Sequence, residues 1–149
     1  MVVNFDDVRI GDLMPNYTTG PITRTHLVRY AGASGDFNPL HHDESFAKMI
    51  GLNNVIAHGM LIMAIAGEAI TAWVDQRSIR KFSVRFLSMT EPVDWNNVEN
   101  TKDRATITVT GKVVKKYEEN GEKLIKCDIV AKDALGSRKL DGFFIVALS

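Results

Sequence analysis

The spacing of apolar residues along the chain changes near residue 80. Between Thr23 and Val74 these residues recur at helical intervals, whereas from Lys81 onward they alternate with polar residues. A period near 3.6 indicates helices, and a period of two indicates strands that bury one face. The sequence therefore predicts a block of helices followed by a run of strands.

The first half carries signals for three helices. Thr23 is a suitable cap for a helix through Ala33, and Asp43 for a short helix through Ile50. The third helix, Gly59–Val74, is apolar almost all round. In a soluble protein such a helix is buried on most of its sides.

Four alternating segments in the second half predict strands. Asn120-Gly121 is a strong hairpin signal between the second and third segments, because both residues tolerate positive φ. Asp133–Ser137 is the next expected turn, and the polar range Asp94–Asp103 is expected to be a long loop. The apolar positions of the segments are, in order, Phe82, Val84 and Phe86; Ala105, Ile107 and Val109; Ile125, Cys127, Ile129 and Ala131; and Leu140, Phe144, Val146 and Leu148.

Helices followed by antiparallel strands imply an α+β fold. A single sheet buries one face readily, and a mostly apolar helix lying in its concave face would supply the rest of the core. No internal repeat and no Pro/Gly/Ser linker divides the 149 residues, so we expect one domain over residues 1–149.

Composition and charge narrow the choice of partners. The apolar fraction of 45% is ordinary for a soluble protein, and 18 basic residues balance 18 acidic ones. This balance gives no electrostatic reason to expect nucleic acid or a membrane as the main partner. Gly59–Val74 is shorter than the ~20 residues of a membrane span, and the N-terminus lacks a signal-peptide pattern. The single cysteine, Cys127, permits no intrachain disulfide and is expected to be buried and inert. We expect a cytoplasmic protein.

The most informative stretch lies between the first two predicted helices. Gly35 permits a sharp backbone path there, and Asn38-Pro39 favours an extended or turn geometry. Such a loop can direct Asp36 and His41 at one point. A carboxylate and an imidazole held together can share a water molecule and move protons near neutral pH.

A second informative piece, His58-Gly59-Met60, lies at the expected start of the apolar helix. The first N–H groups of a helix have no intrahelical partner and carry the positive end of its dipole. Gly59 has no side chain to block approach, so its N–H can bind a thioester carbonyl and stabilise an enolate. For His58, we expect a structural role at the helix start rather than proton transfer.

The run Ser34–His41, SGDFNPLH, with Ala47 six residues later, resembles the signature of the (R)-specific enoyl-CoA hydratases, also called MaoC-like dehydratases. His58-Gly59-Met60 occurs at the family's spacing, and the order of helices and strands is similar along nearly the whole chain. A signature at fixed spacing is far more specific than an isolated Asp and His. The resemblance implies a hot-dog fold, in which a sheet wraps a central helix, and dimers whose sheets join edge to edge.

The resemblance also implies a role for each matching residue. Asp36 and His41 would be the catalytic pair, holding the water that adds to C3 of a trans-2-enoyl thioester to give an (R)-3-hydroxyacyl thioester. Asn38 would orient the pair, and the Gly59 N–H would hold the thioester oxygen. The same groups would catalyse the reverse dehydration, and the sequence leaves open which of the pair moves each proton. No separate cofactor is implied, because coenzyme A or phosphopantetheine is part of the substrate.

One position departs from part of the family. Some single-subunit members carry a serine where this chain has Gly67. Glycines in this stretch are similar to the mycobacterial fatty-acid-elongation dehydratases, in which a catalytic subunit works beside a non-catalytic one. The expected partner is therefore a second copy of the chain or a related subunit.

The acyl chain of such a substrate needs an apolar pocket. Phe37, Met60 and Met63 are candidates to line it, although methionine on a buried helix is usually part of the core. Glu68 is unusual in an apolar helix, because a buried carboxylate needs a partner or a raised pKa. An exposed edge, a dimer interface and the acyl tunnel are all places where Glu68 would fit.

Arg80, Lys81 and Arg85 are candidates to contact the phosphates of coenzyme A or phosphopantetheine. Arg85 alternates with apolar residues, so it more simply faces solvent or the partner. No His, Cys and carboxylate cluster has metal-site spacing, and no Gly-rich dinucleotide fingerprint precedes a helix. We expect neither a metal nor a nicotinamide cofactor.

Two other functions are compatible with a hot-dog fold. The first is an acyl-CoA thioesterase, which would release free thiol, but the Asp and Asn-Pro-Leu-His loop favours a hydratase. The second is a non-catalytic acyl-binding partner subunit of a heteromeric dehydratase. Such a subunit should have lost Asp36 or His41, and this chain has both.

Overall fold

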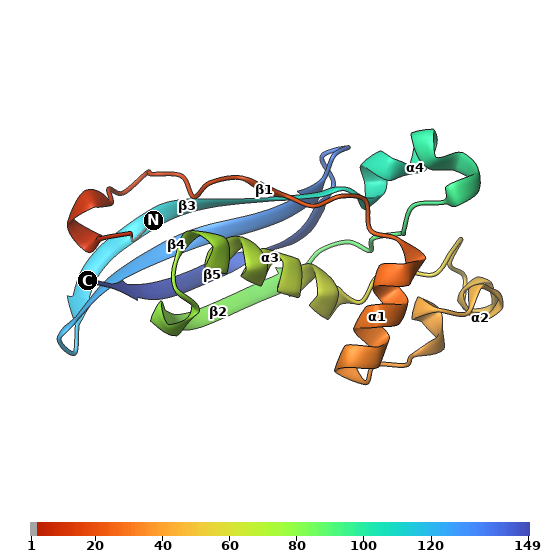
Figure 1. The fold of residues 1–149 in the computed structure, drawn as a ribbon, viewed down its shortest axis with the longest axis horizontal. Coiled ribbons are helices and arrows are strands. Elements are labelled where there is room, and N and C mark those ends of the chain that lie inside the picture. Colours follow the sequence, from red (N-terminus) through yellow and green to blue (C-terminus); the bar gives the residue numbers. More distant parts are fainter. Residues whose placement is uncertain (1–2) are drawn as a thin grey trace.

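The structure, a computed structural model, describes residues 3–149. A five-stranded antiparallel sheet curves around one long helix, α3 (Gly59–Trp73), which lies on its concave side (Figure 1). The predicted α+β architecture, with an apolar helix against the inner face of a sheet, is confirmed.

The sheet has the strand order β1-β3-β4-β5-β2, and every neighbouring pair is antiparallel. The hairpin between β3 and β4 turns at Asn120 and Gly121, which have φ values of 52° and 80° as the dipeptide predicted. β1 has two residues, too few to give a periodic signal, and it was not predicted. The strands are β1 (Tyr17–Thr18), β2 (Ile79–Phe86), β3 (Ile107–Glu119), β4 (Glu122–Asp133) and β5 (Arg138–Leu148).

The core lies between α3 and the inner face of the sheet. Ala66 and Ala69 of α3 are almost completely buried, and their small side chains allow the helix to approach the strands closely. Ile70 and Phe144 are fully buried between the two layers. Cys127 lies in this core, and burial raises the pKa of its thiol to about 12, so it stays protonated and inert.

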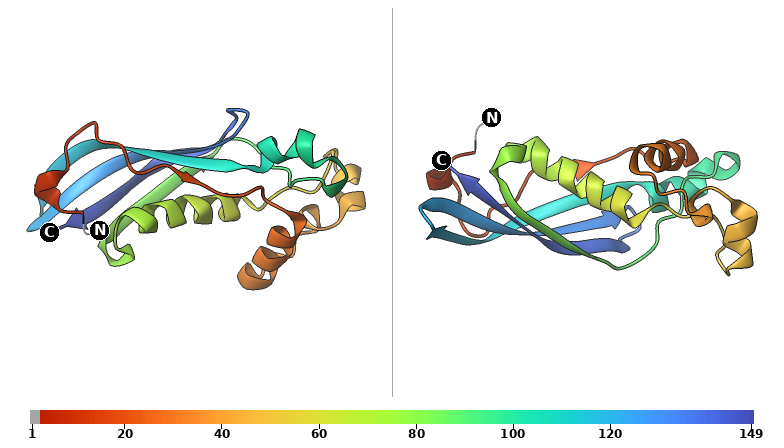
Figure 2. Two further views of the ribbon diagram at one scale, coloured as in Figure 1. Left: turned by 45° about the horizontal axis from the view of Figure 1, so that its top comes forward. Right: turned by 90° about the horizontal axis from the view of Figure 1, so that it is seen from below.

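Three further helices gather at one end of the sheet, while the two ends of the described chain lie at the other (Figures 1 and 2). α1 (Arg24–Ser34) begins at Thr23, whose hydroxyl accepts the His26 N–H, and α2 (Glu44–Met49) is capped by the Asp43 carboxylate. Both caps were predicted. α4 (Val98–Ala105) belongs to the same group and lies next to the end of the sheet.

The range Asp94–Asp103 was expected to be a loop, and this was wrong. Asp94 caps a 3₁₀ turn at Trp95–Asn97, and α4 follows it directly. Only Thr101 and Ala105 of α4 are buried, so the helix has too few apolar residues for a visible period. Ala105, expected in a strand, ends this helix instead.

α3 is less enclosed than its composition suggested. Ala64, Glu68 and Thr71 are exposed on its outer side, so Glu68 lies at an exposed edge of the helix. A hydrogen bond with the Glu68 carboxylate raises the pKa of Tyr17 on β1. Among the described residues, no helix combines the length and the apolar character that crossing a bilayer requires.

A buried ion pair anchors the segment that follows β2. The Lys139 ammonium lies 3.1 Å from the Asp133 carboxylate, and both residues are 5% exposed. Lys139 also donates to the Met89 carbonyl at 2.9 Å, and Asp133 accepts the N–H groups of Leu135 and Ser137 in the turn between β4 and β5. The pair therefore joins this turn to the chain between β2 and α4.

Removing one member of this pair should be costly, because it strands the other charge in the interior. We expect Asp133→Ala to lower the free energy of unfolding by roughly 3–5 kcal/mol, measured by urea denaturation. Lys102→Ala, which removes the exposed pair with Glu99, is the control and should cost less than about 1 kcal/mol. Equal small losses in the two variants would contradict the anchoring role.

Candidate active site

The loop after α1 presents Asp36 through local hydrogen bonds. Gly35 ends α1 in the left-handed region, with φ 76°, and turns the chain sharply. The Asp36 carboxylate accepts the Asn38 N–H at 3.2 Å, and the Asn38 amide oxygen accepts the Leu40 N–H at 3.2 Å. Asn38 thus begins the 3₁₀ turn Pro39–His41, and its side chain acts on the backbone that carries the predicted pair.

The His41 side chain is held by a hydrogen bond to a distant part of the chain. Its ring is buried, and Nδ1 lies 2.7 Å from the Ile56 carbonyl oxygen. Because a carbonyl only accepts, Nδ1 carries the hydrogen in this contact. In the neutral imidazole the free lone pair is then on Nε2, which lies 3.7 Å from the Asp36 carboxylate.

The predicted pair is therefore brought together, with different exposure for each member. The Asp36 side chain is 51% exposed, while that of His41 is 10% exposed. Burial lowers the pKa of His41 below its usual 6.5, although the Ile56 carbonyl and the Asp36 charge oppose this. The gap of 3.7 Å is too long for a direct hydrogen bond, and a water molecule beside it can contact both groups.

His58 forms the inner wall of the site. Its ring stacks on His41 with centroids 3.7 Å apart, and its Nε2 lies 3.1 Å from the Asp36 carbonyl oxygen. Tyr30 of α1 packs edge-on against the same ring, with centroids 4.8 Å apart. The Tyr30 contact and the Ile56 carbonyl had no signal in the sequence, because both depend on chain folding over long separations.

The first turn of α3 begins directly beside the pair. His58 is its N-cap residue, and the His58 side chain makes no hydrogen bond to the helix. Since the first N–H groups of a helix lack intrahelical acceptors, the Gly59 N–H can donate to a ligand. A Cβ atom on Gly59 would lie 3.4 Å from the Phe86 ring, so a side chain at this position would contact Phe86.

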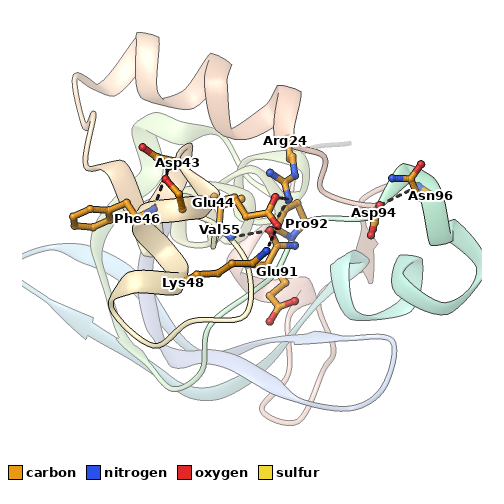
Figure 3. Close-up of polar contacts among 12 residues, drawn as sticks. Arg24, Asp43, Glu44, Phe46, Lys48, Val55, Glu91, Pro92, Asp94 and Asn96 are labelled. Atoms are coloured by element: carbon orange, nitrogen blue, oxygen red, sulfur yellow. Dashed lines mark hydrogen bonds and ion pairs between the residues drawn. The ribbon is translucent and has the colours of Figure 1, made fainter.

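A polar network holds the outer wall of the loop in place (Figure 3). Arg24 at the start of α1 donates to Glu44 of α2 at 3.1 Å and to Asn54 at 2.6 Å, and Lys48 pairs with Glu44 at 2.8 Å. These contacts join α1, α2 and the segment before α3. The two helices that flank the loop carrying Asp36 and His41 are thereby joined to each other.

Asp36, His41 and His58 also form a cluster in which one potential metal-binding atom from each residue lies within 4.8 Å of the others. The sequence spacing had not suggested such a cluster. His41 Nδ1 and His58 Nε2 are already bonded to carbonyl oxygens, so each ring has a single nitrogen left. That the site works without a metal stays a prediction.

A groove of about 510 Å³ opens between α1 and α3, next to Tyr30. None of the predicted acyl-pocket residues Phe37, Met60 and Met63 lines it, and Phe37 and Met60 are 64% and 54% exposed. Their assignment to the acyl pocket stays a prediction. The lining residues are Ile22, Ala33, Leu61, Ile65 and Tyr30, with Thr19, Gly20, His26, Arg29 and Glu68 around them.

The three predicted phosphate contacts lie along the edge strand β2. Arg80 is paired with Glu122 at 2.6 Å and Arg85 with Asp141 at 3.0 Å, while Lys81 lies 5.4 Å from the Phe143 ring centroid. The two arginines are five positions apart on the strand, or roughly 17 Å, so they do not form one phosphate site. Contact with coenzyme A remains a prediction for each.

Solved structures resemble this chain over nearly its whole length. A MaoC-like dehydratase aligns with a TM-score of 0.83 at 32% identity, covering 99% of this chain and 43% of that one. The (R)-hydratase PhaJ1 from Pseudomonas aeruginosa, in its unliganded form, aligns with a TM-score of 0.75 at 25% identity, covering 99% of this chain and 87% of that one. The predicted hot-dog fold is thereby confirmed.

Related curated sequences agree with the structural neighbours. The peroxisomal enoyl-CoA hydratase 2 of Arabidopsis thaliana is 40% identical over 62 residues, which are 40% of this chain and 20% of that protein. The chain thus spans about a fifth of the length of this curated relative. The family model for the MaoC like domain matches residues 10–124. This match covers well over half of the sequence, and the chain belongs to the MaoC-like dehydratase family.

Proposed function

We propose that this protein is a hydro-lyase that interconverts trans-2-enoyl thioesters and (R)-3-hydroxyacyl thioesters. The observation that carries the proposal is the approach of Asp36 Oδ2 to His41 Nε2 at 3.7 Å, next to the N-terminus of α3. Asp36 and His41 bind and activate a water molecule there. The Gly59 N–H at the start of α3 donates to the thioester oxygen.

In the hydration direction, a water molecule donates hydrogen bonds to Asp36 Oδ2 and His41 Nε2. Its oxygen bonds to C3 of the substrate while one of its protons passes to Nε2. The double-bond electrons move through C2 to the thioester oxygen, where the Gly59 N–H stabilises the enolate. The His41 imidazolium, held by the Asp36 charge, then returns the proton to C2.

The cycle adds one water and leaves both residues as they began. Because proton and hydroxyl come from the same pair, both add to one face of the double bond. Dehydration is the same sequence reversed, with neutral His41 removing the C2 proton. We further propose that coenzyme A or phosphopantetheine enters as part of the substrate, without a separate cofactor.

A second subunit is part of the proposal. β2 is an edge of the sheet, and within the described residues no strand lies along its outer side. A second copy, or a related subunit, joining there would extend the sheet. The intact pairing of Asp36 with His41 favours a catalytic subunit over a non-catalytic one.

The direct test is hydration of crotonyl-CoA, followed by loss of the enoyl-thioester absorbance and chiral analysis of the product. We expect (R)-3-hydroxybutyryl-CoA, and a loss of kcat of roughly 100- to 10,000-fold in Asp36→Asn and in His41→Ala. The matched control is Asp128→Asn, which changes an exposed carboxylate. Release of free thiol instead of the hydroxyacyl product would identify a thioesterase.

The pH dependence of kcat/KM tests the role of His41. Only neutral His41 accepts a proton, and burial lowers its pKa below 6.5, so the neutral form persists to lower pH than in a free histidine. Activity should therefore be retained at pH 6.5 and fall at lower pH, as the imidazole becomes protonated. A steady-state profile with its acidic midpoint above 6.5 would contradict a neutral His41 base.

A further inference from the structure

We infer that His58 is a positioning residue, which holds the Asp36 loop through one ring nitrogen and keeps His41 neutral through ring stacking. This inference rests on the proposed function, because it assigns His58 to the same reaction. The sequence suggested only a structural role at the start of α3.

The hydrogen bond of His58 sets its own tautomer. Nε2 lies 3.1 Å from the Asp36 carbonyl oxygen, which can only accept, so Nε2 carries the hydrogen. The residue is 1% exposed, and its Nδ1 is buried without a hydrogen-bond partner among the described residues.

The stacked arrangement couples this ring to His41. The two imidazoles are inclined by 21° at 3.7 Å, and the Tyr30 ring contacts His58 edge-on at an interplanar angle of 60°. The ring of His58 thus excludes water from one face of His41. Burial of this kind disfavours the imidazolium charge of His41.

The charged and titratable groups around His41 come from three elements. Asp36 faces Nε2 from the loop and favours the imidazolium, while His42 lies beside it in the chain with its own Nε2 bonded to the Phe37 carbonyl at 3.2 Å. His58 faces it from the cap of α3, with Tyr30 of α1 behind. Among these groups only the Asp36 charge favours protonation of His41, and the His58 stack disfavours that protonation.

Two substitutions separate the two actions of His58. Gln places an N–H near the position of Nε2 but has no ring, so His58→Gln keeps the bond to the Asp36 carbonyl and removes the stack. Phe keeps the ring and removes the N–H, so His58→Phe frees the Asp36 loop. We expect kcat for crotonyl-CoA to fall roughly 10- to 100-fold in His58→Phe, because the pair is misplaced, with little change in KM.

In His58→Gln the loss of kcat should be smaller, but the acidic limb of the pH profile should move to higher pH because His41 is more easily protonated. A merely structural role would lower the amount of folded protein in both variants and leave the pH profile unchanged. Wild-type kcat and an unmoved pH profile in both variants would also overturn the inference.

Nitrogen NMR on histidine-labelled protein gives a readout that needs no activity. The chain has four histidines, and long-range 1H–15N spectra report the tautomer and the titration of each. We expect the Nε2–H tautomer for His58, and the Nδ1–H tautomer for His41 when it is neutral. An Nδ1–H tautomer for His58 would refute the assignment. A protein inactive on every enoyl thioester would refute the proposed function while leaving this NMR result to decide the role of His58.

Discussion

The packing of α3 into the concave face of the sheet is the constraint from which the site follows. Ala66 and Ala69 bring the helix close to the strands, and this fixes where its first turn emerges. The Ala57 N–H donates to the Thr90 carbonyl at 2.8 Å, and the Ile56 N–H to the Leu40 carbonyl at 3.1 Å. The segment entering the helix is therefore held between the chain that follows β2 and the loop that carries Asp36 and His41. Its Ile56 carbonyl and His58 imidazole form fixed walls of the site.

Two parts of the chain then build the proposed catalytic pair from opposite directions. The loop after α1 supplies Asp36 and His41, while the segment before α3 supplies the Ile56 carbonyl and His58. The carbonyl sets which nitrogen of His41 is basic, and burial lowers the pKa of this imidazole. The carboxylate remains half exposed, so solvent reaches the pair from its side.

Much of this could be predicted from the sequence where the signal was local. Period, caps and the Asn120-Gly121 turn located the main helices and strands, and a fixed motif paired Asp36 with His41. α4 was missed because its residues are mostly polar and only Thr101 and Ala105 are buried. The sequence left three places open for Glu68, and it did not predict the stacking of His58 on His41, because both depend on which distant segments meet. Local patterns predict the helices and strands, but the residues that surround a site depend on contacts between distant segments.

The stereochemistry of hydration is the sharpest test of the proposed mechanism, because a single water held by Asp36 and His41 must add to one face. Crotonyl-CoA would be hydrated in D₂O, and the relative configuration at C2 and C3 of the product determined by NMR. We expect syn addition, with deuterium at C2 on the same face as the new hydroxyl at C3. Anti addition would require a proton donor on the opposite face, and would contradict the mechanism built on this pair.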